Sequence, residues 1–131
     1  EKGLEYSAKE YVRALDRLQH LRNTTNEICD DYDAFVLPTT PAPAWKVENP
    51  SPEFIAGRKG VPERQGIFCS WVNALGYCGI NVPSRTHSDG RHIGVQVISK
   101  NGHDHLIMKL AKEIEKGSRI SESWPGIAYE Q

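Results

Sequence analysis

This 131-residue sequence has three cysteines and nine serines, whose thiols and hydroxyls are candidate nucleophiles. A thiol or hydroxyl attacks a carbonyl group only when a base activates it and N–H groups hold the developing oxyanion. Cys69 and Cys78 lie in or beside predicted buried elements, where a cysteine usually serves as a small hydrophobic residue. We therefore favour a packing role for both over a thiol nucleophile paired with a histidine.

The serines fall in ordinary caps, turns, elements and the C-terminal tail. They are Ser7, Ser51, Ser70, Ser84, Ser88, Ser99, Ser118, Ser121 and Ser123. No Gly-Gly-Ser-Ser-type run surrounds any of them, so none has the backbone setting of a nucleophile. The sequence predicts no catalytic residue in this chain.

Two polar groupings suggest binding chemistry. His103-Asp104-His105 has metal-ligating side chains, but ligands two apart on a helix point to different sides and no third ligand is near. We favour Asp104 as a helix cap with flanking solvated histidines, and predict no metal and no cofactor. Residues 46–59 hold three basic side chains among prolines and acids, which is typical of a solvated loop.

Composition indicates an ordinary globular chain of one domain, with 25% charged and 38% hydrophobic residues. A net charge of -1 gives no case for nucleic acid, and no apolar run is long enough for a membrane span. Three cysteines without a pairing pattern favour a reducing, cytoplasmic location, with a single Cys69–Cys78 bridge as the alternative. The sequence begins at Glu1 without Met, so we expect a processed product or a section of a longer protein.

The elements that must position these residues follow the order helix, strand, helix, strand, strand, helix. A capping box at 7–10 opens a helix that runs to about Cys29, with an apolar face made of Tyr11, Leu15, Leu18, Thr25, Ile28 and Tyr32. Residues 34–37 form a strand apolar on both faces, and a Ser-Pro-Glu signal predicts a short helix over 51–56.

Residues 63–75 form the next predicted helix, with Ile67, Phe68, Trp71, Val72 and Leu75 as one apolar stripe and Gly76 as its stop. Residues 79–83 and 93–99 pair as a hairpin, and the last helix runs from about 104 to 117. The fold class is therefore α/β, with a small mixed sheet of about three strands covered by helices. Its edges and small core suggest that a partner segment is missing.

Three pieces of the sequence resemble the amidase signature family in order and spacing. Residues 11–17 and 32–41 are similar to its long helix and its "D-x-h-h-x-P-T-x-P" strand, where h is hydrophobic. Residues 69–76 are similar to its "T-x-P-x-N-x-x-G" helix, and residues 80–98 to its "h-S-h-P…G-x-P-h-G-h-Q-h-I-G" hairpin. The chain departs from these motifs at Cys69, Trp71, Cys78, Asn81, His92 and Ser99, which concern the substrate pocket more than the fold.

The resemblance implies that this chain is the C-terminal section of an amide-hydrolysing enzyme, over residues 1–117, with a tail over 118–131. It implies a Ser–cis-Ser–Lys triad outside this chain, a missing N-terminal amidase core as partner and a small-molecule amide substrate. Ile67, Phe68 and Trp71 then become candidates for one pocket wall, although their helical spacing favours core packing. The alternatives are a non-catalytic binding or assembly domain derived from the fold, an accidental likeness, and assembly as a homodimer.

Overall fold

The computed structural model describes residues 2–118 and residue 120, so the predicted tail, 118–131, lies almost wholly outside the described part. Helix, strand, helix, strand, strand and helix follow one another as predicted, with short elements inserted before the second helix. The principal elements are α1 (Ala8–Cys29), β1 (Phe35–Pro38), α2 (Ser70–Leu75), β4 (Cys78–Thr86), β5 (His92–Ser99) and α3 (Asp104–Ser118).

The central sheet has three strands in the order β1-β5-β4. Phe35 of β1 pairs with Ile98 of β5, and Ile80 of β4 pairs with Val97 on the other side of the same strand. The predicted fold class, α/β with about three strands, is confirmed. Both pairings are antiparallel, whereas a mixed sheet was predicted.

Helix α3 covers one face of the sheet and forms the main core with it. Ile107 and Ala111, one turn apart on α3, pack against Val82 of β4 and Val97 of β5. All four side chains are buried, and further apolar residues of the same helix face border them. The apolar face of the last predicted helix therefore packs on the sheet.

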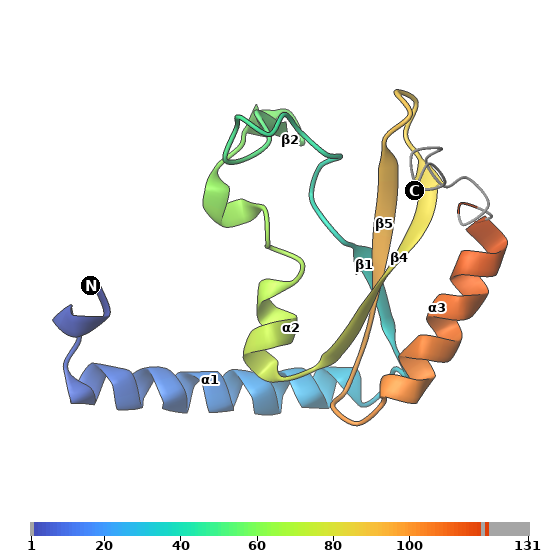
Figure 1. Ribbon diagram of the computed structural model, residues 1–131. Coiled ribbons are helices and arrows are strands. Elements are labelled where there is room, and N and C mark those ends of the chain that lie inside the picture. The colour runs from blue at the N-terminus through green and yellow to red at the C-terminus, as the bar shows by residue number, and fades with distance from the viewer. Residues whose placement is uncertain (1, 119, 121–131) are drawn as a thin grey trace, which may run out of the picture.

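Helix α2 approaches the other side of the sheet at a glycine. A Cβ atom added to Gly79 would lie 3.5 Å from Val72 Cγ1 and 3.9 Å from Ile98 Cγ1, so the helix packs directly on the strands there. Figure 1 shows α2 and α3 on opposite sides of the sheet, with α1 running beneath α2 and continuing beyond it. None of the described helices is long and apolar enough to cross a membrane.

The predicted capping box opens α1. The Glu10 N–H donates to Ser7 Oγ over 3.3 Å, and the Ser7 N–H donates to Glu10 Oε2 over 2.8 Å. The predicted apolar face is partly wrong, because Ile28 and Tyr32 are exposed while Arg22 is half-buried. Since successive residues turn by about 100°, Arg22 lies on the face of Cys29, and Ile28 lies to one side of it.

The predicted short helix over 51–56 is wrong. Phe54–Ile55 (β2) pairs instead with Arg58–Lys59 (β3) across a turn in which Ala56 and Gly57 have φ of 49° and 75°. The Gly60 N–H donates to Glu53 O over 2.8 Å and closes this hairpin. The local helix-start signal at 51–53 is outweighed by backbone pairing with the basic segment that follows it.

The helix predicted over 63–75 is reduced to its last part. Pro62–Arg64 forms a short 3-10 turn (η2), and α2 begins only at Ser70. The Gly66 carbonyl accepts hydrogen bonds from Ser70 N over 2.9 Å and from Ser70 Oγ over 2.7 Å. Glycine destabilises a helix interior, and a serine hydroxyl competes with backbone N–H groups for the backbone carbonyls. Turns therefore replace the first half of the predicted helix. Gly76 ends α2 in the left-handed conformation, as predicted.

The strand β1 was predicted to be covered on both faces. Its burial alternates instead, and Val36 is exposed on the side away from the core. No described element covers this side chain, so the second face of β1 lacks the cover that its apolar composition calls for.

Candidate functional site

Gln96 is the central polar residue of the candidate site and lies within β5, the middle strand of the sheet. It is only 4% exposed. Its Nε2 atom donates to the Phe68 carbonyl over 2.7 Å and lies 3.4 Å from the Pro38 carbonyl. Its Oε1 atom lies 3.6 Å from Cys69 Sγ. One buried amide of β5 thereby ties the end of β1 and the segment before α2 to the sheet.

The first residue after β1 adds a second set of ties at this point. Thr39 donates its N–H to the Gly94 carbonyl over 3.2 Å and its hydroxyl to Asn81 Oδ1 over 3.2 Å. The Thr39 carbonyl lies 3.4 Å from Cys69 Sγ. A Cβ atom on residue 94 would lie 2.9 Å from Thr39 Oγ1, so the close approach requires glycine there.

The three candidate pocket residues occupy different settings. Ile67 is 54% exposed and precedes α2, where the chain is still in turns. Phe68 is half-buried, and its carbonyl is the one held by Gln96. Trp71, on α2, packs edge-on against Tyr77 with ring centroids 5.7 Å apart. The structure therefore does not bring them together as one apolar stripe.

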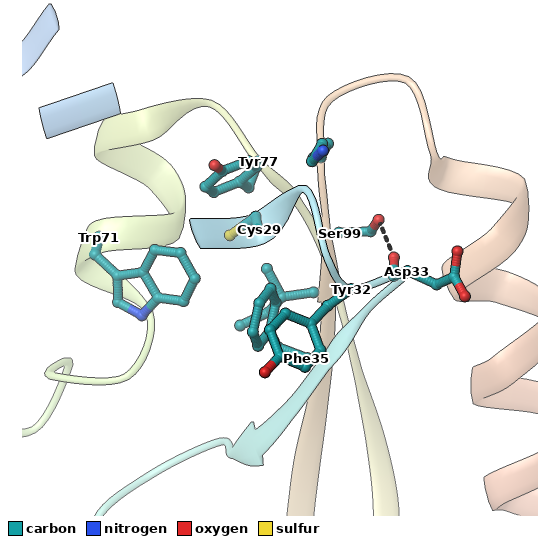
Figure 2. Close-up of a pocket in the computed structure, with 9 residues that line it drawn as sticks. Cys29, Tyr32, Asp33, Phe35, Trp71, Tyr77 and Ser99 are labelled. Carbon is teal, nitrogen blue, oxygen red and sulfur yellow. Dashed lines mark hydrogen bonds between the residues drawn. The ribbon is translucent and has the colours of Figure 1, made fainter. Parts of the chain in front are cut away.

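Trp71 lines a narrow crevice between α2, the end of α1 and the start of β1 (Figure 2). The crevice holds about 200 Å³ between atoms and has no room for a water molecule. Aromatic rings fill much of its wall, including Tyr32 and Phe35 with centroids 5.3 Å apart. Trp71 thus packs inward in the described chain, and Ile67 faces outward.

Tyr77 closes the same crevice from the strand side. Its hydroxyl donates to Asn26 Oδ1 over 2.6 Å. Burial raises the pKa of Tyr77 to about 12, and the Cys29 thiol and the Asp30 carboxylate beside it add to this effect. The phenol is therefore neutral at physiological pH and acts as a hydrogen-bond donor that joins α1 to the end of α2.

Ser99 and His103 form the one described pair that resembles a nucleophile with its base. Ser99 Oγ lies 3.0 Å from His103 Nδ1 and donates to the Asp33 carbonyl over 2.7 Å. A hydroxyl has a single proton, so Nδ1 must be the donor to Oγ and cannot accept its proton. Ser99 is also buried. The geometry assigns this pair to fixing the start of α3, not to catalysis.

The tip of the β4–β5 hairpin is tied to the proline-rich loop. Arg91 donates to Asp89 and to the Ala44 carbonyl, and His87 Nδ1 lies 2.8 Å from Asp89 Oδ1. Hydrogen bonds from the Arg91 side chain hold the pKa of the Asp89 carboxyl well below its usual range. An open recess of about 160 Å³ lies between this loop and residues 92–93.

The other predicted groupings are placed as follows. Cys29, Cys69 and Cys78 are free thiols. His103 precedes α3 and its carbonyl accepts from Leu106 N over 2.9 Å, so Asp104 is the first helical residue rather than the cap. Among the described residues, no group of three or more His, Cys, Asp or Glu side chains is arranged to hold a metal ion.

Sequence reasoning did not single out Gln96 as a positioning residue. Its position in a strand between Val95 and Val97 was the available signal, because a buried amide must find partners for its donors and acceptor. Which partners it finds depends on the turn at 66–69, and this turn was predicted as helix.

Most of the sequence matches one family of known proteins. The sequence profile described as Amidase matches residues 2–108. A glutamyl-tRNA(Gln) amidotransferase subunit of Treponema denticola is 29% identical over 112 residues, which are 86% of this chain and 22% of that protein. The corresponding subunit of Bartonella quintana is 34% identical over 94 residues, 70% of this chain and 18% of that protein.

Solved structures agree with this match. A crystal structure described as an amidase superposes with a TM-score of 0.79 at 26% identity, over 89% of this chain and 27% of that chain. The glutamyl-tRNA(Gln) amidotransferase subunit of Thermotoga maritima superposes with a TM-score of 0.67 at 28% identity, over 82% and 22%. A 6-aminohexanoate cyclic dimer hydrolase, with a TM-score of 0.80 at 19% identity, covers 95% and 27% and shows the shared fold. The chain spans about a fifth of the length of the curated relatives it matches.

Proposed function

Because this chain belongs to the amidase family, we propose that it is the C-terminal section of an amide-hydrolysing enzyme. Its role is to complete the α/β fold and to form one wall of the substrate pocket. The chain spans about a fifth of the length of its relatives, and the other four-fifths are long enough to hold a catalytic apparatus. The 131 residues hold no Gly-Gly-Ser-Ser-type run, so the nucleophile of this proposal lies in the other part of the enzyme.

The hydrogen bond from Gln96 to Phe68 is the observation that carries the proposal. A pocket wall must keep its shape while substrate binds, and side chains on turns do so only when other groups fix their backbone. Gln96 supplies this fixation for the turn at 66–69 from the middle of the sheet. Because a buried amide needs hydrogen-bond partners, Gln96 holds the Phe68 carbonyl and with it the backbone of this turn.

We assign the three candidate residues different parts in this wall. Ile67 is apolar and exposed, so it is the side chain available to contact substrate. Phe68 lies beside it, with its carbonyl fixed by Gln96. Trp71 packs on Tyr77 and supports the wall from behind.

In the proposed reaction, a serine outside this chain attacks the amide carbonyl, the C–N bond breaks, and the amine leaves with a proton. Water then hydrolyses the acyl-enzyme to the acid and frees the serine. For a primary carboxamide substrate the leaving group is ammonia, and an amidotransferase would pass it to a second substrate. Several relatives are named as subunits of glutamyl-tRNA(Gln) amidotransferase, so transfer of the ammonia to a second substrate is the alternative to its release.

The test compares this chain with the complete enzyme. Both are treated with a fluorophosphonate, which labels activated serines, and with a panel of primary amides and anilides monitored by ammonia or aniline release. We expect labelling and turnover from the complete enzyme and neither from the 131-residue chain. Turnover by the chain alone would place a nucleophile inside it and overturn the proposal. A complete protein that is neither labelled nor active would instead support a binding or assembly role.

A further inference from the structure

Helix α1 has one face whose N-terminal half lies open and whose C-terminal half is covered. The residues of this face, each three or four positions from the next, are Tyr11, Leu15, Leu18, Arg22, Thr25 and Cys29. Cys29 is 4% exposed, and Leu18, Arg22 and Thr25 are half-buried. Tyr11 and Leu15 are 64% and 46% exposed. The C-terminal half of this face is therefore packed against the rest of the described chain, and the N-terminal half is exposed to solvent.

A groove accompanies the open half. The short 3-10 helix η1 (Lys2–Glu5) precedes α1, and an opening of about 610 Å³ lies beside the first turns of α1. Tyr6, Ala8, Tyr11 and Ala14 contribute most of its apolar lining. Figure 1 shows this half of α1 extending away from the sheet, with η1 turned back over its start and no other element beside it.

The charged groups of α1 leave this groove free for an apolar partner. Lys9, Arg13 and Asp16 lie on the opposite face of the helix and are exposed to solvent. Glu10 lines the groove, but its carboxylate already accepts from Ser7 N and Ser7 Oγ, over 2.8 Å and 2.7 Å. The surface thus offers apolar side chains, and the carboxylate at its edge already has hydrogen-bond partners in Ser7.

The open half of α1 lacks the packing that normally keeps a helix folded. Most of a helix's stability in a protein comes from burial of its apolar face, so the uncovered half of α1 has little stabilisation from packing. Contiguous exposed apolar side chains also mark interaction sites. A partner surface that continues the α1–α2 interface would supply the missing burial.

We propose that Tyr6, Ala8, Tyr11, Ala14 and Leu15, here called the α1 docking face, bind the part of the amidase enzyme that carries the nucleophile. The partner is an apolar surface of that part, seated in the groove and continuous with the α1–α2 interface. The curated relatives are about five times as long as the segment matched here, so their remaining part is large enough to cover this face. This inference rests on the proposed function, since it assumes that the rest of the enzyme exists.

The first experiment uses the complete enzyme with photo-reactive p-benzoylphenylalanine in place of Tyr11, and in place of Arg13 as the opposite-face control. We expect position 11 to cross-link to the nucleophile-bearing part and position 13 to give no such product. Cross-links from position 11 between two copies of residues 1–131 would make the occupant a second copy and overturn the proposal. Absence of any cross-link at position 11 would show an open surface and overturn it as well.

A second, independent measurement uses Leu15→Lys and the matched control His20→Lys in the complete enzyme. Both variants place lysine, a good helix former, on an exposed position of α1, but on opposite faces. Amide exchange over residues 10–18 should become at least about tenfold faster in Leu15→Lys and stay unchanged in His20→Lys. Equal exchange in the two variants would contradict the docking face.

Hydrolytic activity separates this inference from the proposed function. An active complete enzyme whose α1 variants and cross-links show no preference refutes the docking face alone. An inactive complete protein in which position 11 still cross-links to the other part refutes the amidase activity alone.

Discussion

The side-chain amide of Gln96 donates a 2.7 Å hydrogen bond to the carbonyl oxygen of Phe68, although the two residues are 28 positions apart. The bond joins the middle strand of the sheet to a turn that has little other cover. The candidate pocket wall is therefore supported from the protein interior, and its shape depends on one residue that no substrate needs to touch.

Gln96→Met tests this support, since methionine keeps much of the volume and loses the hydrogen bonds. We expect unfolding to become easier by about 1–3 kcal/mol in urea denaturation, because the Phe68 carbonyl loses its partner. In the complete enzyme KM should rise more than kcat falls. Gln19→Met is the control, because Gln19 makes an exposed bond to Asn23 and should change stability by less than about 0.5 kcal/mol. Equal effects of the two substitutions would contradict the role of Gln96.

Gly94→Ala tests the close approach of Thr39 to the sheet. The new methyl group would meet Thr39 Oγ1 at 2.9 Å, so we expect a destabilisation of about 1–3 kcal/mol. The double variant Gly94→Ala with Thr39→Ala should lose less stability than the sum of the single variants, because the clash is gone. Thermal or urea unfolding of the four proteins gives the coupling energy, and additive effects would refute this contact.

Ser99→Ala separates structure from catalysis. The substitution removes the 2.7 Å bond to the Asp33 carbonyl, so we expect a loss of about 1–2 kcal/mol in unfolding free energy. Fluorophosphonate labelling and kcat of the complete enzyme should be unchanged within a few-fold. Loss of labelling would mean that the Ser99–His103 pair acts as a nucleophile after all.

Tyr77→Phe tests a pH dependence at the alkaline end. The folded-state pKa of Tyr77 is raised to about 12, so its contribution to stability is fully present below about pH 10. It is lost as the pH rises from there through the folded-state value. The unfolding free energy of the unchanged protein should therefore fall more steeply between pH 10 and pH 12 than that of Tyr77→Phe. Parallel curves would contradict a raised pKa.

Local signals in the sequence predicted those elements whose stabilising contacts are also local. The capping box at Ser7 and Glu10, the stop at Gly76 and the turn between β4 and β5 each involve residues a few positions apart. The same kind of signal failed at 51–56, where a helix start was present. Pairing of Phe54 with Lys59 and the approach of Gly60 to Pro52, where a Cβ would lie 1.7 Å from the carbonyl oxygen, decided the outcome.

The candidate site was harder to predict, because its contacts join distant segments. The Gly-x-Gln element was recognised as part of a family motif, but nothing in the sequence says that residue 96 reaches the Phe68 carbonyl. Likewise, periodicity predicted one stripe through Ile67 and Trp71, and the turn at 66–69 separates them. Helical spacing describes which residues share a face only where the helix forms.

The strand order β1-β5-β4 also determines when β1 can pair with its neighbour during translation. β1 spans Phe35–Pro38, yet its one neighbouring strand among the described residues is β5, in which Ile98 pairs with Phe35. At about 5–20 residues per second, the ribosome needs roughly 3–12 s to make the 62 residues between Phe35 and Ile98. β1 therefore waits without its partner strand during translation, while β4, β5 and α3 follow one another and can join as soon as they emerge.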